Sequence, residues 1–69
     1  MTKIPIAPVM RMIKNTSNNV RVSKDAGIEL TKILESIGTE ISKDAVMFAK
    51  HAGRNTVKSA DIFLAYENY

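Results

Sequence analysis

One stretch of the chain decides its fold: residues 23–53, which read SKDAGIELTKILESIGTEISKDAVMFAKHAG. Its apolar residues recur at spacings of three or four and therefore fall on one face of an α-helix; they are Ala26, Leu30, Ile33, Ile37, Ile41, Ala45, Phe48 and Ala52. Ser23 predicts the start of this helix, because its hydroxyl can accept a hydrogen bond from a first-turn amide. Gly53 predicts the end, because glycine readily adopts a positive φ.

Such a helix is too long for a monomer of this size. At 1.5 Å per residue it would extend about 43 Å, whereas a globule of 69 residues has a diameter of about 25 Å, taken as twice its radius of gyration. Its apolar face therefore needs a partner, and the simplest partner is a second copy lying across it. We expect an obligate dimer.

Length and composition predict one domain over residues 1–69, near the size at which a single core is marginal. The chain has no cysteine and one histidine, so we expect no disulfide, no metal and no other cofactor. No apolar run approaches membrane-spanning length, and residues 1–10 lack the apolar core of a signal peptide. These features predict a soluble, cytoplasmic protein.

Positive charge is segregated along the chain. The net charge is only +3, but residues 1–22 contain cations and no acid, namely Lys3, Arg11, Lys14 and Arg21. The long helix contains both cationic and acidic residues. Arg54 and Lys58 follow it in the sequence, ahead of Asp61 and Glu67. Segregation of this kind indicates a polyanion that binds at particular places.

The segments on either side of the long helix mirror each other. We expect a short helix whose first position is Pro8, with an apolar face of Val9, Met12, Ile13 and Thr16, and a last short helix capped by Ser59. Residues 20–22 and 56–58 predict brief extended pieces. Two antiparallel copies could pair these pieces and gather the cations of both loops into a phosphate cradle at each end of the dimer.

Taken together, these pieces resemble the archaeal histones, the dimeric histone-fold proteins that wrap DNA. The resemblance extends from Ile4 to Tyr69, and its most specific part is the run His51-Ala52-Gly53-Arg54 followed by Thr56, Lys58 and Asp61. It implies an all-α histone fold with a short helix, a loop, a long central helix, a loop and a short helix, assembled as a handshake dimer. It also implies association with the chromosome in the cytoplasm.

The resemblance implies roles for particular residues. The DNA contacts would be Arg11, Lys14, Arg21, Asn55, Thr56 and Lys58. Arg54 and Asp61 would form a structural ion pair, and Phe48, His51 and Asp61 would lie where two dimers meet. Asn55 stands where a lysine is common, and Phe63 and Tyr66 replace residues that are frequently charged. We therefore expect shorter or looser assemblies on DNA than are typical of the family.

Two functions remain open at this point. The first is an architectural DNA-wrapping protein without base readout, which would bind double-stranded DNA and itself or a paralogous histone. The second is a histone-fold heterodimerisation module in a transcription-related assembly, with DNA binding incidental. An enzyme is not expected, because the carboxylates are dispersed and no nucleophile has a base at motif spacing.

Overall fold

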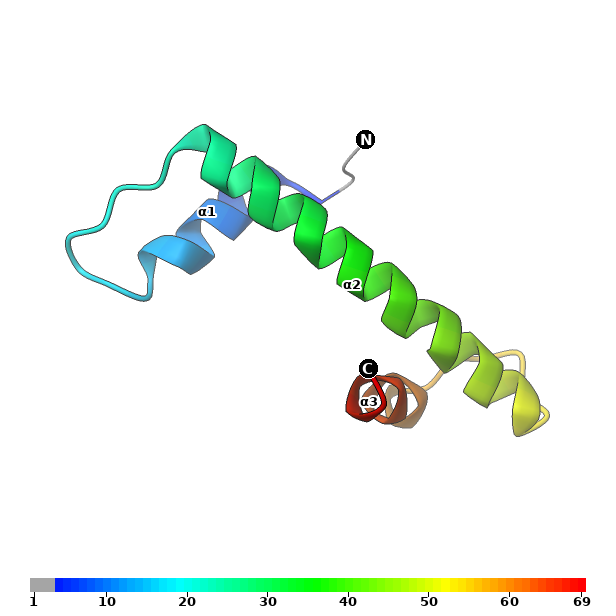
Figure 1. Ribbon diagram of the computed structural model, residues 1–69. Coiled ribbons are helices and arrows are strands. Elements are labelled where there is room, and N and C mark those ends of the chain that lie inside the picture. The colour runs from blue at the N-terminus through cyan, green and yellow to red at the C-terminus, as the bar shows by residue number, and fades with distance from the viewer. Residues whose placement is uncertain (1–3) are drawn as a thin grey trace. The chain divides into compact units, whose positions relative to one another are not determined.

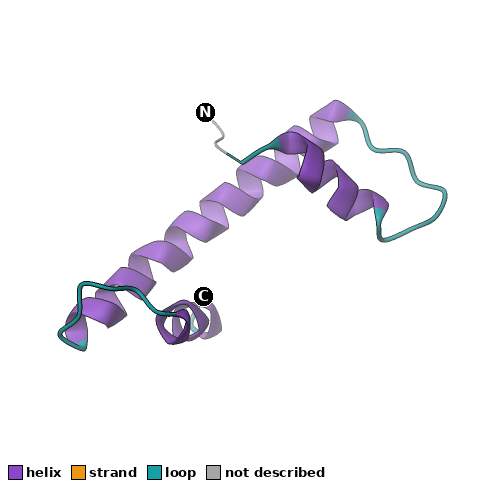
Figure 2. Ribbon diagram, turned by 180° about the vertical axis from the view of Figure 1, so that it is seen from behind, coloured by secondary structure: helices purple, strands orange, loops and turns teal. Residues whose placement is uncertain are grey.

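The structure is a computed structural model that describes residues 4–69. Three helices follow one another along the chain: α1 (Ile6–Lys14), α2 (Lys24–His51) and α3 (Ser59–Glu67), as Figure 1 shows. Loops connect them, and no strand occurs within the described residues (Figure 2). The predicted all-α class is confirmed, as is the order short helix, long helix, short helix.

The ends of α2 lie where the sequence predicts them. At the start, the hydroxyl of Ser23 accepts a hydrogen bond of 3.1 Å from the amide of Ala26. At the end, Gly53 has φ +77°, the amide of Gly53 donates to the carbonyl of Lys50, and that of Arg54 donates to the carbonyl of Ala49. These two bonds are the Schellman arrangement, which satisfies carbonyl groups that the helix end leaves without partners.

The starts of the two short helices were predicted at the wrong residue. α1 begins at Ile6, two residues before Pro8, because a proline is tolerated anywhere in a first turn whose amides have no helical partner. α3 begins at Ser59, so the capping position belongs to Lys58. The serine was a good candidate by residue type, but the cap is supplied by a side chain further along the helix.

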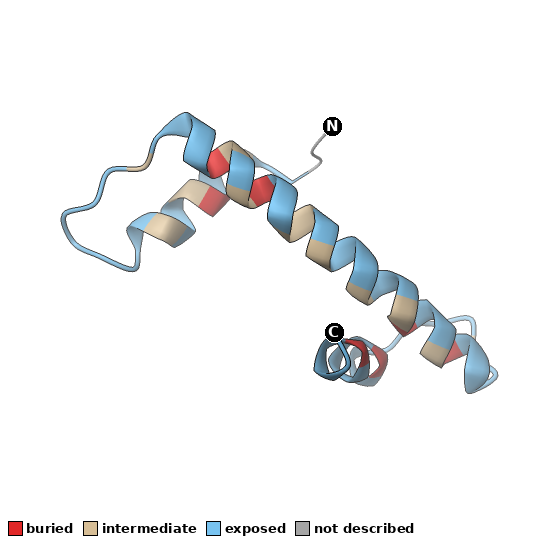
Figure 3. Cartoon of the chain, in the orientation of Figure 1, coloured by how far each residue is buried: buried red, intermediate tan, exposed pale blue. Residues whose placement is uncertain are grey.

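The chain divides into two compact units, Met1–Ser36 and Ile37–Tyr69. In the first unit α1 packs on the early turns of α2 (Figure 3). Val9 is buried there, and a Cβ at Gly27 would lie only 2.5 Å from Cγ of Met10. Thr31 is fully buried and donates its hydroxyl proton to the carbonyl of Gly27, at 2.7 Å. Met12, predicted on the apolar face of α1, is exposed instead.

In the second unit the buried positions lie on the later turns of α2 and on α3. Ala45 and Ala49 are buried on α2, and Asp61 and Ala65 are buried on α3. Ala65 follows Asp61 by one helical turn, so that both lie on one side of α3. Phe63 stands on the opposite side of α3 by the same periodicity and is 60% exposed.

A single copy buries only small side chains well. The largest fully buried side chain among the described residues is Thr31, whereas the half-exposed or exposed large apolar residues include Ile33, Val46, Met47, Ile62, Phe63, Leu64 and Tyr66. The accessible surface is 5579 Å², against about 4300 Å² for a folded monomer of this mass. The chain thus leaves apolar surface uncovered that a globular protein of its size would bury.

No helix within residues 4–69 combines the length and the apolar character needed to cross a membrane.

Candidate nucleic-acid interface

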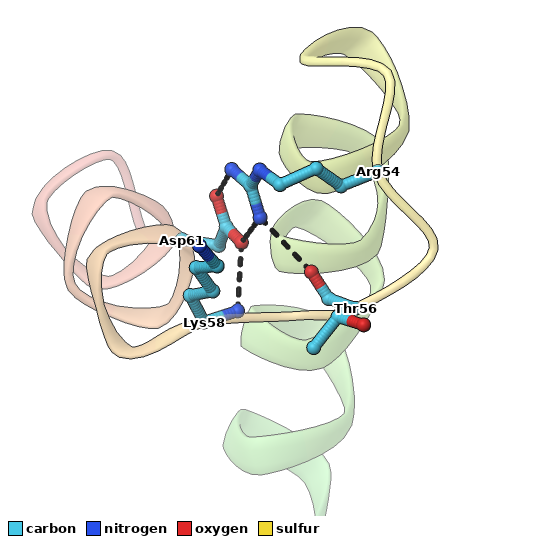
Figure 4. Close-up of polar contacts among 4 residues, drawn as sticks. All are labelled: Arg54, Thr56, Lys58 and Asp61. Atoms are coloured by element: carbon cyan, nitrogen blue, oxygen red, sulfur yellow. Dashed lines mark hydrogen bonds and ion pairs between the residues drawn. The ribbon is translucent and has the colours of Figure 1, made fainter.

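The loop between α2 and α3 is held in place by one guanidinium group. Arg54 contacts the carboxylate of Asp61 with both terminal nitrogens, Nη1 to Oδ2 at 2.9 Å and Nη2 to Oδ1 at 3.0 Å. Nη1 also donates to the backbone carbonyl of Thr56, at 2.9 Å (Figure 4). A bidentate pair of this kind fixes orientation as well as distance. The structure therefore brings Arg54 and Asp61 together and ties the middle of the loop to the first turn of α3.

Asp61 also caps the helix on which it lies. Its Oδ2 accepts a hydrogen bond of 2.8 Å from the backbone amide of Lys58, which is half of a capping box. Hydrogen bonds from Arg54 and from this amide favour the ionised carboxylate and lower the pKa of Asp61 from 3.8 to about 2. The contact with Asp61 raises the pKa of Arg54 in turn.

The same contacts leave the polar side chains of this loop outside the ion pair. Asn55, Thr56 and Lys58 are exposed, and Figure 4 shows the side chain of Thr56 pointing away from the guanidinium group. Only the backbone of Thr56 is used to hold the loop. The hydroxyl, the amide and the ammonium groups of these three residues can therefore meet an external anion without disturbing the loop.

A second basic segment lies at the end of α1 and in the loop after it. Arg11 and Lys14 occupy the last turn of α1, and Arg21 lies in the loop. All three are exposed. Within the described residues the ion pairs join Arg54 to Asp61 and Lys43 to Glu40, so these three cations have no acidic partner there. Their charge is directed to solvent.

The two basic segments belong to different units of the chain. Arg11, Lys14 and Arg21 lie in the first unit, whereas the loop residues 54–58 lie in the second. Residues 20–22 and 56–58 are not assigned as strands in the single chain. The predicted pairing of these two pieces across two copies, which would bring the basic segments together, stays a prediction.

The residues predicted at a contact between dimers differ in how accessible they are. His51 is exposed in the last turn of α2, and Phe48 is half-buried one turn earlier. Asp61 is only 5% exposed, and three hydrogen bonds already occupy its two oxygens. A carboxylate has about four acceptor positions, so Asp61 has little capacity left for another protein.

Sequence reasoning missed two residues that shape this protein. Gly27 has no role in the predictions from the sequence, yet its missing side chain leaves room for Met10. Lys58 counted only as a cation, yet its amide is the group that Asp61 caps. The signals were present in the sequence, as a glycine inside a strong helix and an acid three residues after a cap. No cluster of His, Cys, Asp or Glu side chains that could hold a metal occurs among residues 4–69.

Comparison with known proteins identifies the family. Residues 2–66 match the family described as histone-like transcription factor (CBF/NF-Y) and archaeal histone. The chain is 46% identical over 65 residues to a subunit of the archaeal histone HAN1 of Thermococcus zilligii, covering 94% of this chain and 96% of the relative. It is 42% identical over 62 residues to probable archaeal histone 3 of Methanocaldococcus jannaschii, covering 90% and 91%.

These matches confirm the resemblance and, with the three helices, the histone fold predicted from the sequence. The chain belongs to the family of histone-like transcription factors and archaeal histones.

Proposed function

We propose that this protein is an architectural, non-enzymatic DNA-binding protein that dimerises and wraps or compacts double-stranded DNA in the chromosome of an archaeal cell. The single observation that carries the proposal is the exposure of Arg11, Lys14 and Arg21 in a segment without acids. Both relatives named above are described as archaeal histones, which supports the same function.

The proposed dimer is a homodimer or a pair with a paralogous histone, and its support comes from the uncovered surface. The excess of accessible surface over a typical monomer is about 1300 Å² per chain. Two chains that cover this excess bury about 2600 Å² in total, which lies within the range of obligate homodimers. Dimerisation thus accounts for the apolar side chains that one copy leaves exposed.

The proposed DNA contacts are made to phosphates. Arg11, Lys14 and Arg21 supply cations from one loop, and Asn55, Thr56 and Lys58 supply a cation and neutral donors from the other. Arg54 is engaged with Asp61 and holds the second loop in shape. Contacts of this kind fix the protein on the backbone of the duplex without reading bases, so any sequence preference would follow the ease of bending the DNA.

The first test is the salt dependence of binding to a short duplex of random sequence. Each phosphate contact contributes about −0.9 to the slope of log K against log salt. Because a homodimer carries each residue twice, Arg11→Ala should lower the magnitude of the slope by about 2 and weaken binding to all sequences alike. Lys32, an exposed cation of α2 outside both basic segments, supplies the control Lys32→Ala, which should leave the slope unchanged. Equal effects of the two substitutions would contradict the assignment of Arg11.

The second test is nuclease digestion of DNA reconstituted with the pure protein. A regular ladder of protected lengths would support wrapping by dimers that extend through the surface of Phe48 and His51. A single short protected length would support bending by a dimer or a closed small assembly, as the changes at Asn55, Phe63 and Tyr66 suggest. No protection at physiological salt would reject the DNA-wrapping function in favour of a heterodimerisation module.

A further inference from the structure

The chain just before α1 is tied to α2 by a side chain. The backbone amide of Ile4 donates a hydrogen bond of 3.0 Å to Oε2 of Glu35, which lies in the middle turns of α2. These residues are 31 positions apart, whereas the other side-chain hydrogen bonds between residues 4 and 69 join positions at most seven apart. Figure 1 shows the segment before α1 running beside α2. The bond is therefore a tertiary contact within the first unit.

Glu35 is one of two points on α2 that hold the start of α1. The other is Gly27, whose missing side chain leaves room for Ile6 and Met10. Gly27 and Glu35 lie about 12 Å apart along the helix axis, at 1.5 Å per residue. Contact at Gly27 alone would let α1 pivot about that point, whereas two separated contacts fix its direction. Pro5, at the N-cap of α1, makes no side-chain capping bond, so the helix has no such anchor of its own.

The direction of α1 decides where its cations lie. Arg11 and Lys14 are exposed in the last turn of α1, at the end away from the bond to Glu35. Lys14 is about 12 Å from Ile6 along the helix axis. A rotation of α1 by about 20° about its first residue would therefore displace Lys14 by about 4 Å. That displacement exceeds the length of a hydrogen bond between two charged groups, so phosphate contacts at this end depend on how the start of α1 is held.

We propose that Glu35 is a positioning residue of the proposed DNA interface: its carboxylate holds the segment before α1 and so sets the direction in which Arg11 and Lys14 face the phosphates. The inference rests on the proposed function and adds to it an acidic residue outside both basic segments. Removing an acid raises the net charge and ordinarily strengthens binding to a polyanion. Removing Glu35 should weaken that binding instead, and the opposite sign makes the proposal testable.

The first measurement compares Glu35→Ala with Glu29→Ala in binding to a short duplex of random sequence. Glu29 is the matched control, because it is an exposed acid of the same helix and lies nearly opposite Gly27. Glu29→Ala should bind DNA at least as tightly as the wild type. Glu35→Ala should bind about three- to tenfold more weakly than Glu29→Ala, since binding must then restore a direction that one hydrogen bond held. Equal binding by the two variants would overturn the proposal.

Glu35→Gln and the salt slope separate positioning from a general loss of folded protein. Glutamine keeps an oxygen that can accept the hydrogen bond from the Ile4 amide, so Glu35→Gln should bind at least as tightly as the wild type. The slope of log K against log salt should fall in magnitude for Glu35→Ala, as for Arg11→Ala, because phosphate contacts of α1 are lost. Weaker binding with an unchanged slope, or a Glu35→Gln protein as weak as Glu35→Ala, would overturn the proposal. A wild-type protein that does not bind the duplex at low salt would overturn the proposed function itself, and this proposal with it.

Discussion

Replacing Gly27 by valine tests whether the close contact between α1 and α2 holds the first unit together. A Cβ at this position would lie 2.5 Å from Cγ of Met10, 3.2 Å from its sulfur and 3.1 Å from Cγ2 of Ile6. The nearest of these atoms is in the middle of the methionine side chain, so either Met10 changes its rotamer or α1 shifts. Valine adds two further carbons at the same crowded position.

The magnitude follows from two opposing terms. Overpacking of a well-packed contact costs about 1–3 kcal/mol, and the upper end applies to a β-branched side chain at this distance. Valine is more favourable than glycine in a helix by about 0.4 kcal/mol, which offsets a small part. We therefore expect Gly27→Val to destabilise each chain by about 2.5 kcal/mol, which lowers the melting temperature by roughly 10–20 °C in a protein of this size.

The assay is thermal unfolding followed by circular dichroism at one fixed protein concentration, because the stability of a dimer depends on concentration. Ser36→Val is the control for a valine in an exposed turn of the same helix. Adding Met10→Ala to the valine variant should recover stability, so that the double variant costs less than the sum of the two single ones. A Gly27→Val protein that melts at or above the wild-type temperature would refute the reasoning.

The remaining predictions concern the end of α2 and the loop after it. Gly53→Ala should destabilise the protein by about 1–2 kcal/mol, because alanine is strained at a positive φ. Gly53→Asn should destabilise it less in the same unfolding assay, and equal effects of the two substitutions would argue against backbone strain. Asp61→Asn should lower the melting temperature at neutral pH by removing the bidentate contact with Arg54. The folded pKa of Asp61 is lowered to about 2 from 3.8, so its stabilisation is present above about pH 4 and is lost as the pH falls toward 2. The wild-type melting temperature should therefore approach that of the Asn variant over this interval, and two parallel pH profiles would show that the carboxylate contributes nothing.

Asp61 was predicted both in a structural ion pair with Arg54 and at a contact between dimers, and its hydrogen bonds limit the second role. Its oxygens bind Arg54 and the amide of Lys58, and little of the side chain reaches the surface. A second dimer that uses this carboxylate would compete with the bonds that shape the loop between α2 and α3, which is proposed to contact DNA. His51, which is exposed in the last turn of α2, is the better candidate for a contact between dimers. Replacing His51 should therefore affect assembly on DNA with less damage to the fold.

Local interactions explain why so much of the fold was predictable. The cap at Ser23 and the stop at Gly53 depend on residues within one turn of the helix end. A serine is preferred at the start because its hydroxyl accepts a hydrogen bond from a nearby amide, and a glycine is preferred at the end because it adopts a positive φ. The start of α3 was misplaced by one residue because its cap is a bond from the Lys58 amide to Asp61. In the candidate site, the exposure of the cations was predictable from their residue type and from the absence of acids nearby in the sequence.

The sequence by itself determined the three helices, the charge segregation and the need of a long apolar face for a partner, since these follow from periodicity, end signals and composition. Only the tertiary structure decided why Gly27 stands inside a strong helix, that Met10 and not Met12 packs there, and that Arg54 binds Asp61 with both terminal nitrogens. Periodicity assigns a residue to a side of its own helix. Which atoms meet across two elements depends on how closely their backbones approach, and that distance is a property of the packed chain.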